Sequence, residues 1–251
     1  MSLLQILALF PVGIAAGWIN VMAGGGSLLS IPAMLFFGME GPSANGTNRI
    51  SIIAQNVTAV STFRRRGFSD FRLSLSLAAA ASVGAVFGAH FGTRLDGPWF
   101  SRVVAIVMIA VLILMALGGE KRLAEDGRKD GKAKNLVAGH LLMTIAGIWG
   151  GFIQIGVGFI MMPILSRVMG LDLVRVNMHK VFIALVYSIV ALAIFASRVE
   201  LMWLAGLSLA AGNSVGGWLG AHFTVSRGEV LVRRVFMLAI MALIVKLLFF
   251  P

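Results

Sequence analysis

Two short polar and basic pairs begin otherwise apolar stretches of this sequence. Asn48-Arg49 and His179-Lys180 stand 131 positions apart, and each precedes a long run of apolar residues. A guanidinium group offers a planar fork of donors that suits a sulfonate or carboxylate, and an ammonium group supplies a compact positive charge. The residue types therefore predict a site for a small anion.

Two glycine-rich stretches interrupt apolar runs near these pairs. The first is Gly24-Gly25-Gly26-Ser27, and the second is Gly156-Val157-Gly158. Glycine weakens a helix by about 1 kcal/mol per residue, and broken backbone inside a membrane is tolerated where it lines a cavity or is buried in protein. We expect two discontinuous helices whose freed amide groups help to hold an anion. The alternative is a glycine seam that lets two helices pack closely.

Further polar residues lie inside the apolar runs. Asn20 and Gln154 each precede a glycine stretch, and Asn56 and Tyr187 are again 131 positions apart. Each could face a substrate or be satisfied by a neighbouring helix. The predicted substrate-binding residues are Asn20, Gly24, Gly25, Gly26, Ser27, Asn48, Arg49, Gln154, Gly156, Gly158, His179 and Lys180, with Asn56, Tyr187, Thr47 and Asn177 as secondary candidates.

The acidic residues lie away from the middle of every apolar run. All 10 fall at the ends of these runs or between them. A cation transporter normally needs a carboxylate within the membrane, and a hydrolase needs paired carboxylates or a Ser-His-Asp set. The interior therefore favours neutral or anionic cargo.

Two interpretations of Arg49 and Lys180 remain open from the sequence. They could bind the anion directly, or they could extend to opposite membrane interfaces and act there as anchors or gates. His90 and His222 occupy equivalent places near segment ends, and histidine can change its charge near neutral pH. They are candidates for coupling transport to a proton, or they are ordinary residues at helix ends.

The composition is that of a polytopic membrane protein. The chain has 251 residues, of which 59% are hydrophobic and 12% charged. Apolar segments of helical length are spaced along it, and the prediction is an all-α membrane protein. The segments are 3–23, 27–38, 44–63, 73–93, 101–118, 135–155, 158–170, 175–197, 201–222 and 230–250. Cysteine is absent, and we expect no cofactor and no metal.

The sequence contains an internal duplication around a polar linker. Residues 75–91 match residues 207–223 at 12 of 17 positions, and both stretches end in Gly-Ala-His-Phe. The predicted parts are an N-terminal repeat (1–118), a cytoplasmic linker (119–134) and a C-terminal repeat (135–251). The small residues Gly84, Gly88, Gly216 and Gly220 predict that segments 73–93 and 201–222 approach each other closely.

An odd number of segments in each repeat predicts that the second repeat is inverted. With the linker in the cytoplasm, 15 lysine and arginine residues lie in cytoplasmic connections and 3 lie on the opposite side. This fits the positive-inside rule and places both termini outside the cytoplasm. The net charge of +11 is then a topological signal, and we expect no nucleic-acid partner.

The chain resembles the sulfite exporter TauE/SafE family. The resemblance rests on Gly17-Trp18-Ile19-Asn20-Val21-Met22-Ala23-Gly24-Gly25-Gly26-Ser27-Leu28-Leu29-Ser30-Ile31-Pro32, on residues 44–48 and on the related stretch 151–163, and it covers the whole chain. It implies a transporter in the cell inner membrane for sulfite, an organosulfonate or a related sulfur compound. The second glycine stretch departs from the first, which leaves open whether both halves contact the substrate equally.

Three functions compete at this stage. The leading one is a secondary transporter that moves a small anion by alternating access. An anion channel would use the same broken helices, and a membrane enzyme would have to build its chemistry from Ser27, His179 and Lys180. The expected partners are the anion, the lipid bilayer and a coupling proton, and the oligomeric state, a homodimer included, stays open.

Overall fold

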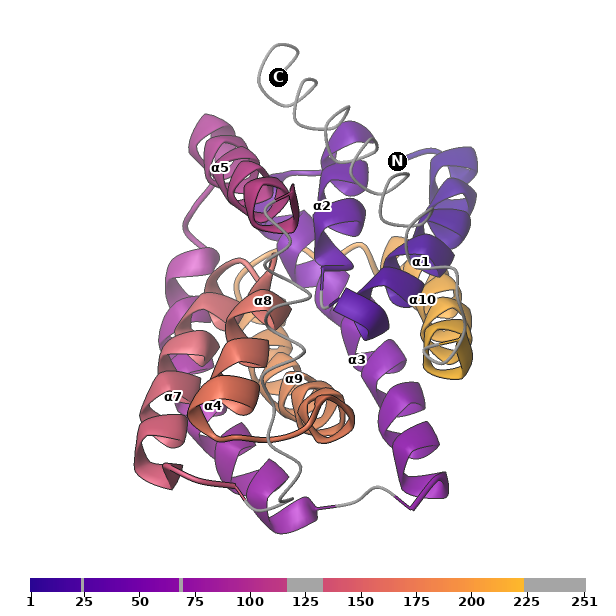
Figure 1. Ribbon diagram of the computed structural model, residues 1–251. Helices are drawn as coiled ribbons and strands as arrows, with labels where there is room; N and C mark the ends of the chain where they lie inside the picture. Colours follow the sequence, from indigo (N-terminus) through magenta and orange to yellow (C-terminus); the bar gives the residue numbers. More distant parts are fainter. Residues whose placement is uncertain (24, 68–69, 117–132, 224–251) are drawn as a thin grey trace.

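A computed structural model describes residues 1–23, 25–67, 70–116 and 133–223, and all regular structure within these ranges is helical (Figure 1). Helical structure is present at every predicted segment that precedes residue 224. Segment 230–250, Gly24 and linker residues 119–132 lie outside the described residues. The helices are α1 (Leu3–Ala23), α2 (Ser27–Phe36), α3 (Gly41–Arg65), α4 (Phe71–Gly92), α5 (Gly97–Ala116), α7 (Leu136–Phe152), α8 (Val157–Pro163), the π-helical turn η1 (Ile164–Val168), α9 (Leu173–Ala196) and α10 (Trp203–Phe223).

Both predicted helix breaks are present. Helix α1 ends at Ala23 and α2 begins at Ser27, while α7 ends at Phe152 and α8 begins at Val157. The second break lies slightly earlier than expected, because Gly158 already belongs to α8. At that break Gly156 has φ 71°, a left-handed conformation that glycine adopts without a steric penalty.

Each break folds the chain back as a hairpin. The backbone amide of Lys134, before α7, donates to the Met169 carbonyl after η1 at 2.9 Å, and the Asn135 side chain donates to the Val168 carbonyl at 3.0 Å. The hairpin of α7, α8 and η1 therefore returns to the end from which it started. In Figure 1 the N-terminus and the far end of α2 lie together at the opposite end of the molecule.

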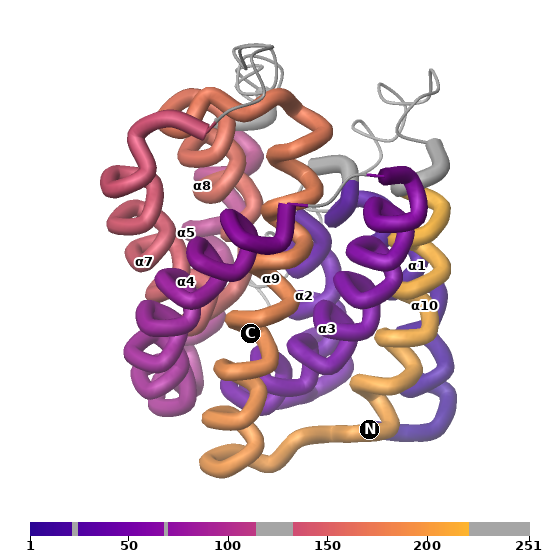
Figure 2. Tube along the Cα trace, turned by 90° about the horizontal axis from the view of Figure 1, so that it is seen from below, coloured from indigo at the N-terminus to yellow at the C-terminus, as the bar shows by residue number. Residues whose placement is uncertain are grey.

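The helices pack as two bundles that combine both halves of the sequence. Helix α1 packs along α10, and both α2 and α10 pack on α3; we call these four helices the first bundle. Helix α7 packs along α4, and α4 and α8 pack on α9; these four are the second bundle. Helices α3 and α9 meet between the bundles, and Figure 2 shows α4 and α7 on one side of the molecule with α1, α3 and α10 on the other. The packed units thus differ from the two halves of the sequence.

Glycines allow the closest helix contacts, although not between the predicted partners. A Cβ added at Gly84 or Gly88 would lie about 2 Å from the Thr144 or Ile148 carbonyl oxygen of α7 (2.0 and 1.9 Å). A Cβ added at Gly216 would lie 2.0 Å from a carbonyl oxygen of α1. The expectation that segments 73–93 and 201–222 pack on each other is therefore wrong. The glycine-bearing face of α4 packs in parallel on α7, and that of α10 packs in parallel on α1.

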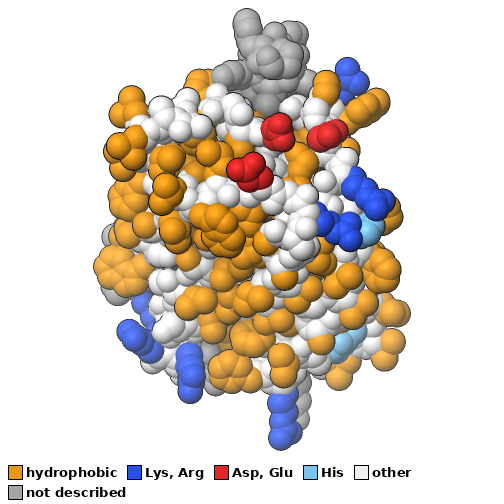
Figure 3. All heavy atoms as spheres, turned by 180° about the vertical axis from the view of Figure 1, so that it is seen from behind, with side chains coloured by type: hydrophobic (Ala, Val, Ile, Leu, Met, Phe, Trp, Pro, Cys, Tyr) orange, Lys and Arg blue, Asp and Glu red, His pale blue; other side chains and the backbone are white. Residues whose placement is uncertain are grey.

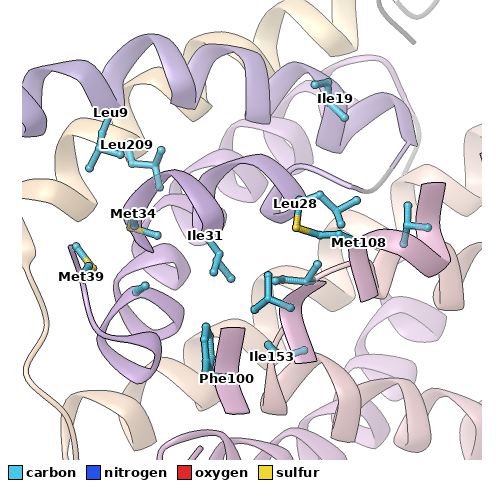
Figure 4. Packing of buried hydrophobic residues seen from close by; sticks show 14 of the residues in the cluster. Leu9, Ile19, Leu28, Ile31, Met34, Met39, Phe100, Met108, Ile153 and Leu209 are labelled. Carbon is cyan, nitrogen blue, oxygen red and sulfur yellow. The ribbon is translucent and has the colours of Figure 1, made fainter. Parts of the chain in front are cut away.

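A buried apolar cluster holds α2 between α1, α10 and α5. Leu28 and Ile31 of α2 are fully buried, together with Phe100 and Met108 of α5 and Leu209 of α10. Figure 4 shows Leu28 beside Met108, with Ile31 pointing into the space between α2 and α5. This packing fixes the N-terminal end of α2, where Ser27 is the first helical residue after the break.

The outer surface suits lipid. Apolar side chains at every fourth position of two neighbouring helices are exposed: Val83, Phe87 and Phe91 on α4, and Val137, Leu141 and Ile145 on α7. Hydrophobic side chains cover most of the face in Figure 3, with acidic side chains toward its upper end and basic side chains at its lower end and along its upper right edge. Among the described residues, Leu3–Val21, Phe71–Gly92 and Leu173–Ala196 are long and apolar enough to cross a membrane.

Candidate functional site

A small polar cavity lies between the two bundles, beside both helix breaks. Its volume is about 20 Å³, which is room for one or two water molecules. The first bundle and the second bundle both contribute walls. The lining residues are Asn20, Ser27, Ile52, Asn56, Gln154, Val157, Gly158, Met161, Lys180, Val181, Ala184 and Tyr187.

The first break supplies Ser27 and Asn20 to the cavity in a fixed arrangement. The Asn20 amide donates to Gln55 Oε1 at 3.0 Å, and its Oδ1 accepts from the backbone amide of Gly26 at 3.3 Å. Asn48 donates to Ser27 Oγ at 3.2 Å and accepts from Ser30 Oγ at 2.6 Å. Asn48 thus lies behind the cavity and orients Ser27, whose own hydroxyl hydrogen can turn toward a ligand.

The second break supplies Gln154, in an unusual backbone conformation. Gln154 has φ 62°, which is rare outside glycine and indicates a position held by its surroundings. Its Nε2 donates to Ser188 Oγ at 3.1 Å, while its Oε1 is buried without a hydrogen-bond partner. The Asn56 side-chain amide and the Tyr187 hydroxyl are likewise buried and unpaired. The cavity therefore gathers polar groups whose hydrogen bonds are not made within the protein.

The two basic residues at equivalent sequence positions have different surroundings. Lys180 lines the cavity and is 4% exposed, whereas Arg49 is fully buried outside the cavity lining. Both side chains are buried inside the protein, which contradicts the alternative that they extend outward to opposite membrane interfaces. Only Lys180 is placed to contact an anion in the cavity as the structure stands.

Arg49 instead binds the end of α7 at the second break. Its guanidinium donates to the Gly150 carbonyl at 3.1 Å and to the Gly151 carbonyl, and it lies 4.5 Å from the centre of the Phe195 ring. Asn45, one turn earlier, donates to the Phe152 carbonyl at 2.7 Å. These carbonyls end a helix and would otherwise lack partners, and they carry its partial negative charge. Arg49 and Asn45 thus hold the second break in place from the first bundle.

Replacing Arg49 with glutamine should destabilise the protein. The change leaves buried helix-end carbonyls without a charged donor, which costs about 3 kcal/mol, and we expect the melting temperature in detergent to fall by roughly 10 °C. Arg65→Gln removes an exposed arginine from the same helix and should change little. An equal fall in the melting temperature of Arg65→Gln would show that the loss of a positive charge alone explains the effect.

The other predicted residues lie outside the cavity lining. Gly25, Gly26 and Gly156 form the breaks themselves, and a Cβ at Gly26 would lie 2.4 Å from the Ala16 carbonyl oxygen, so this stretch also packs closely. The hydroxyl of Thr47 accepts from the Met202 amide at 3.1 Å. Asn177 is buried near the start of α9.

The histidines are dispersed. His179 Nδ1 lies 2.8 Å from Ser74 Oγ, which joins α9 to α4 within the second bundle. His90 lies near the end of α4, with its ring against Phe91, away from the cavity. His222 belongs to the last turn of α10, and its side chain lies outside the described residues. Their role in proton coupling stays a prediction.

Sequence reasoning missed some residues that support the site. Asn45 shares a helix face with Arg49 because the two are four positions apart, a spacing that could have indicated a common partner. Ser188, which holds Gln154, follows Tyr187 directly but carries no signal of its own within an apolar run. The apolar part of the lining, such as Ile52 and Ala184, is indistinguishable in sequence from ordinary core.

The chain is similar to known membrane transporters over most of its length. The family model of the sulfite exporter TauE/SafE matches residues 9–247. The chain belongs to this family. Because it is a family of membrane transporters, the chain is a multi-pass membrane transporter and not an enzyme.

Its relatives carry matching descriptions. A "probable membrane transporter protein ORF9" from Sinorhizobium sp. is 25% identical over 97% of this chain and 92% of its own length. The "probable membrane transporter protein YfcA" of Escherichia coli strain K12 is 26% identical over 99% of this chain and 91% of its own. A "probable membrane transporter protein" of Haemophilus influenzae is 26% identical over 90% of this chain and 87% of its own. No solved structure matches the chain.

Proposed function

We propose that this TauE/SafE family member carries a small anion across the cell inner membrane by alternating access at the cavity between the two bundles. The cargo is sulfite, an organosulfonate or a related organosulfur anion. The observation that carries the proposal is the cavity itself, which places the Lys180 ammonium group beside unpaired hydrogen-bond donors at the meeting point of two broken helices.

Two inverted repeats are part of this proposal. In support, α1 runs parallel to α10, since Ser208 donates to the Ile6 carbonyl and Gly216 lies against Trp18 further along both helices. Helix α7 runs parallel to α4 in the same manner, and the two hairpins open toward opposite ends of the molecule. Broken helices at the interface of inverted repeats are a common design for substrate sites in secondary transporters.

The orientation follows from the distribution of charge. We place the end that carries Arg64, Arg65, Arg66 and Arg72 in the cytoplasm, with the linker, and the N-terminus on the opposite side. The two bundles, rather than the two halves of the sequence, are then the bodies that move against each other. This motion would have to rearrange the contact between α3 and α9. It would also change the hydrogen bond from Arg49 to α7.

A transport assay in liposomes tests the proposal. Liposomes that contain the protein and are preloaded with unlabelled sulfite should take up labelled sulfite faster than liposomes without internal sulfite. The reason is that a carrier returns across the membrane more quickly when it is loaded. A channel gives no such stimulation. Saturable exchange supports the carrier, and uptake that is unaffected by internal sulfite, organosulfonate or other small anions contradicts it.

Tyr187→Phe should weaken this exchange specifically. The change removes only a hydroxyl that lines the cavity, and the loss of one hydrogen bond to an anion predicts a half-saturating concentration about ten-fold higher. Thr58→Val is the matched control, because the Thr58 hydroxyl donates to the Ala54 carbonyl of its own helix at 3.1 Å. Equal effects of the two substitutions would place the substrate elsewhere.

A further inference from the structure

The cavity offers an unpaired acceptor as well as donors. Gln154 is 2% exposed, its Nε2 is used by Ser188, and its Oε1 has no partner. The Tyr187 hydroxyl lies close to the side chains of Gln154 and Ser188, but no partner meets the distance and angle of a hydrogen bond with it. A buried carbonyl oxygen without a donor costs free energy, and a bound group that brings a hydrogen removes that cost.

The donors around this oxygen are well matched to a single anion. The Asn56 side-chain amide is 1% exposed and unpaired, and the hydroxyls of Ser27 and Tyr187 can each donate into the cavity. Lys180 supplies one positive charge, and the described lining residues include no second cation and no carboxylate. A doubly charged anion would leave one charge uncompensated in a desolvated site, which is costly.

An anion without a hydrogen would also meet Gln154 unfavourably. Its oxygens carry lone pairs, and one of them would face the lone pairs of Gln154 Oε1. Ser188 holds the Gln154 amide group through Nε2, so the oxygen cannot turn away without breaking that bond. An anion that carries one O–H or N–H group would instead donate to Gln154 and accept from the surrounding donors.

We infer that the cavity selects a singly charged oxyanion that itself carries a hydrogen-bond donor, and that Gln154 Oε1 accepts the hydrogen bond from this donor. The inference rests on the proposed function, since it names the protonation class of the anion bound at that site. Hydrogensulfite belongs to this class, whereas the sulfite dianion and methanesulfonate do not. The small volume of the cavity, about 20 Å³, favours an anion of few atoms.

Calorimetric titration of the purified protein tests the inference with three probes. The first is sulfite at mildly acidic pH, where it is hydrogensulfite, and the second is sulfite at alkaline pH, where it is the dianion. Methanesulfonate is measured at both pH values, because it is a monoanion without a hydrogen-bond donor at either. Any change in its affinity with pH reports titration of the protein and is used to correct the sulfite data. The wild type should bind hydrogensulfite about ten-fold more tightly than methanesulfonate at acidic pH, and the advantage should vanish at alkaline pH.

Gln154→Met separates the role of this residue from the role of the site. It keeps the side-chain length and the backbone requirement at this position but removes the acceptor. Affinity for hydrogensulfite should fall about ten-fold. Affinity for methanesulfonate should not fall, because the lone pairs of Gln154 Oε1 no longer face this anion. Ser188→Ala removes the partner that fixes the Gln154 amide group, so the oxygen can turn away from the anion, and the preference for hydrogensulfite should weaken.

The outcomes distinguish the two proposals. Tighter binding of the dianion, or a hydrogensulfite preference that persists unchanged in Gln154→Met, overturns the inference while the site for an anion stands. If none of the three anions binds and Lys180→Met gives the same result as the wild type, the proposed function itself fails and the inference with it.

Discussion

Replacing Lys180 with methionine is expected to lower the affinity for sulfite by about 100-fold. Lys180 lines the cavity, is 4% exposed, and is the cation among the described lining residues. Methionine has a similar length and fits the same space, so the change removes the charge and leaves the packing largely intact. An anion moved from water into this site would then lack its countercharge, and charge-assisted hydrogen bonds contribute about 1.5–3 kcal/mol each.

The control for this prediction is Arg175→Gln. Arg175 lies on the same helix, at its exposed start, and pairs with Asp172 at 3.3 Å. This variant changes the net charge by the same amount and should bind sulfite with wild-type affinity in calorimetric titration. An affinity that falls equally in both variants would mean that the protein attracts anions through its overall charge and not through the cavity.

Gly88→Val is expected to have the largest effect on stability. Helices α4 and α7 pack so closely that a Cβ at Gly88 would lie 1.9 Å from the Ile148 carbonyl oxygen and 2.7 Å from the Phe152 amide nitrogen. Backbone atoms cannot move aside as a flexible side chain can, and overpacking costs upwards of about 3 kcal/mol here. The separation of α7 from α4 also shifts the end of α7 at Phe152, and with it Gln154, which follows in the break.

Thermal unfolding in detergent, followed by size-exclusion chromatography, measures this effect. Gly88→Val should lower the melting temperature by more than roughly 10 °C or leave no folded protein. Ala79→Val adds a similar volume to the same helix at an exposed position and should be nearly neutral. If Gly88→Val proves as stable as the wild type, α4 and α7 do not approach as closely as described.

The predictions from sequence were best where one local rule decided the outcome. Three consecutive glycines in an apolar run weaken a helix whatever surrounds it, and the chain breaks there as expected. Asn20, Ser27, Gln154 and Lys180 were all predicted near the anion, and the structure brings them to one cavity. Polar residues in a membrane interior need a partner, so their position alone is informative.

The failures concern partners, which depend on the tertiary fold. Gly84 and Gly88 show that α4 has a small face, but nothing local says that α7 lies against it. Arg49 and Lys180 are equivalent in sequence, yet Arg49 binds helix-end carbonyls and Lys180 lines the cavity. Which helix ends lie within reach of a long side chain is decided by how the bundles combine the two halves of the chain, and no local pattern records this.

The central claim is that a small anion binds between the two bundles, at the meeting point of the two broken helices. Anomalous diffraction from crystals soaked in selenite, a heavier analogue of sulfite, locates such an anion directly. The account predicts one strong selenium peak within hydrogen-bonding distance of Lys180 and the Tyr187 hydroxyl, and its absence in Lys180→Met crystals. Selenium found only at surface arginines such as Arg64 and Arg65, with the cavity empty at saturating selenite, would contradict it.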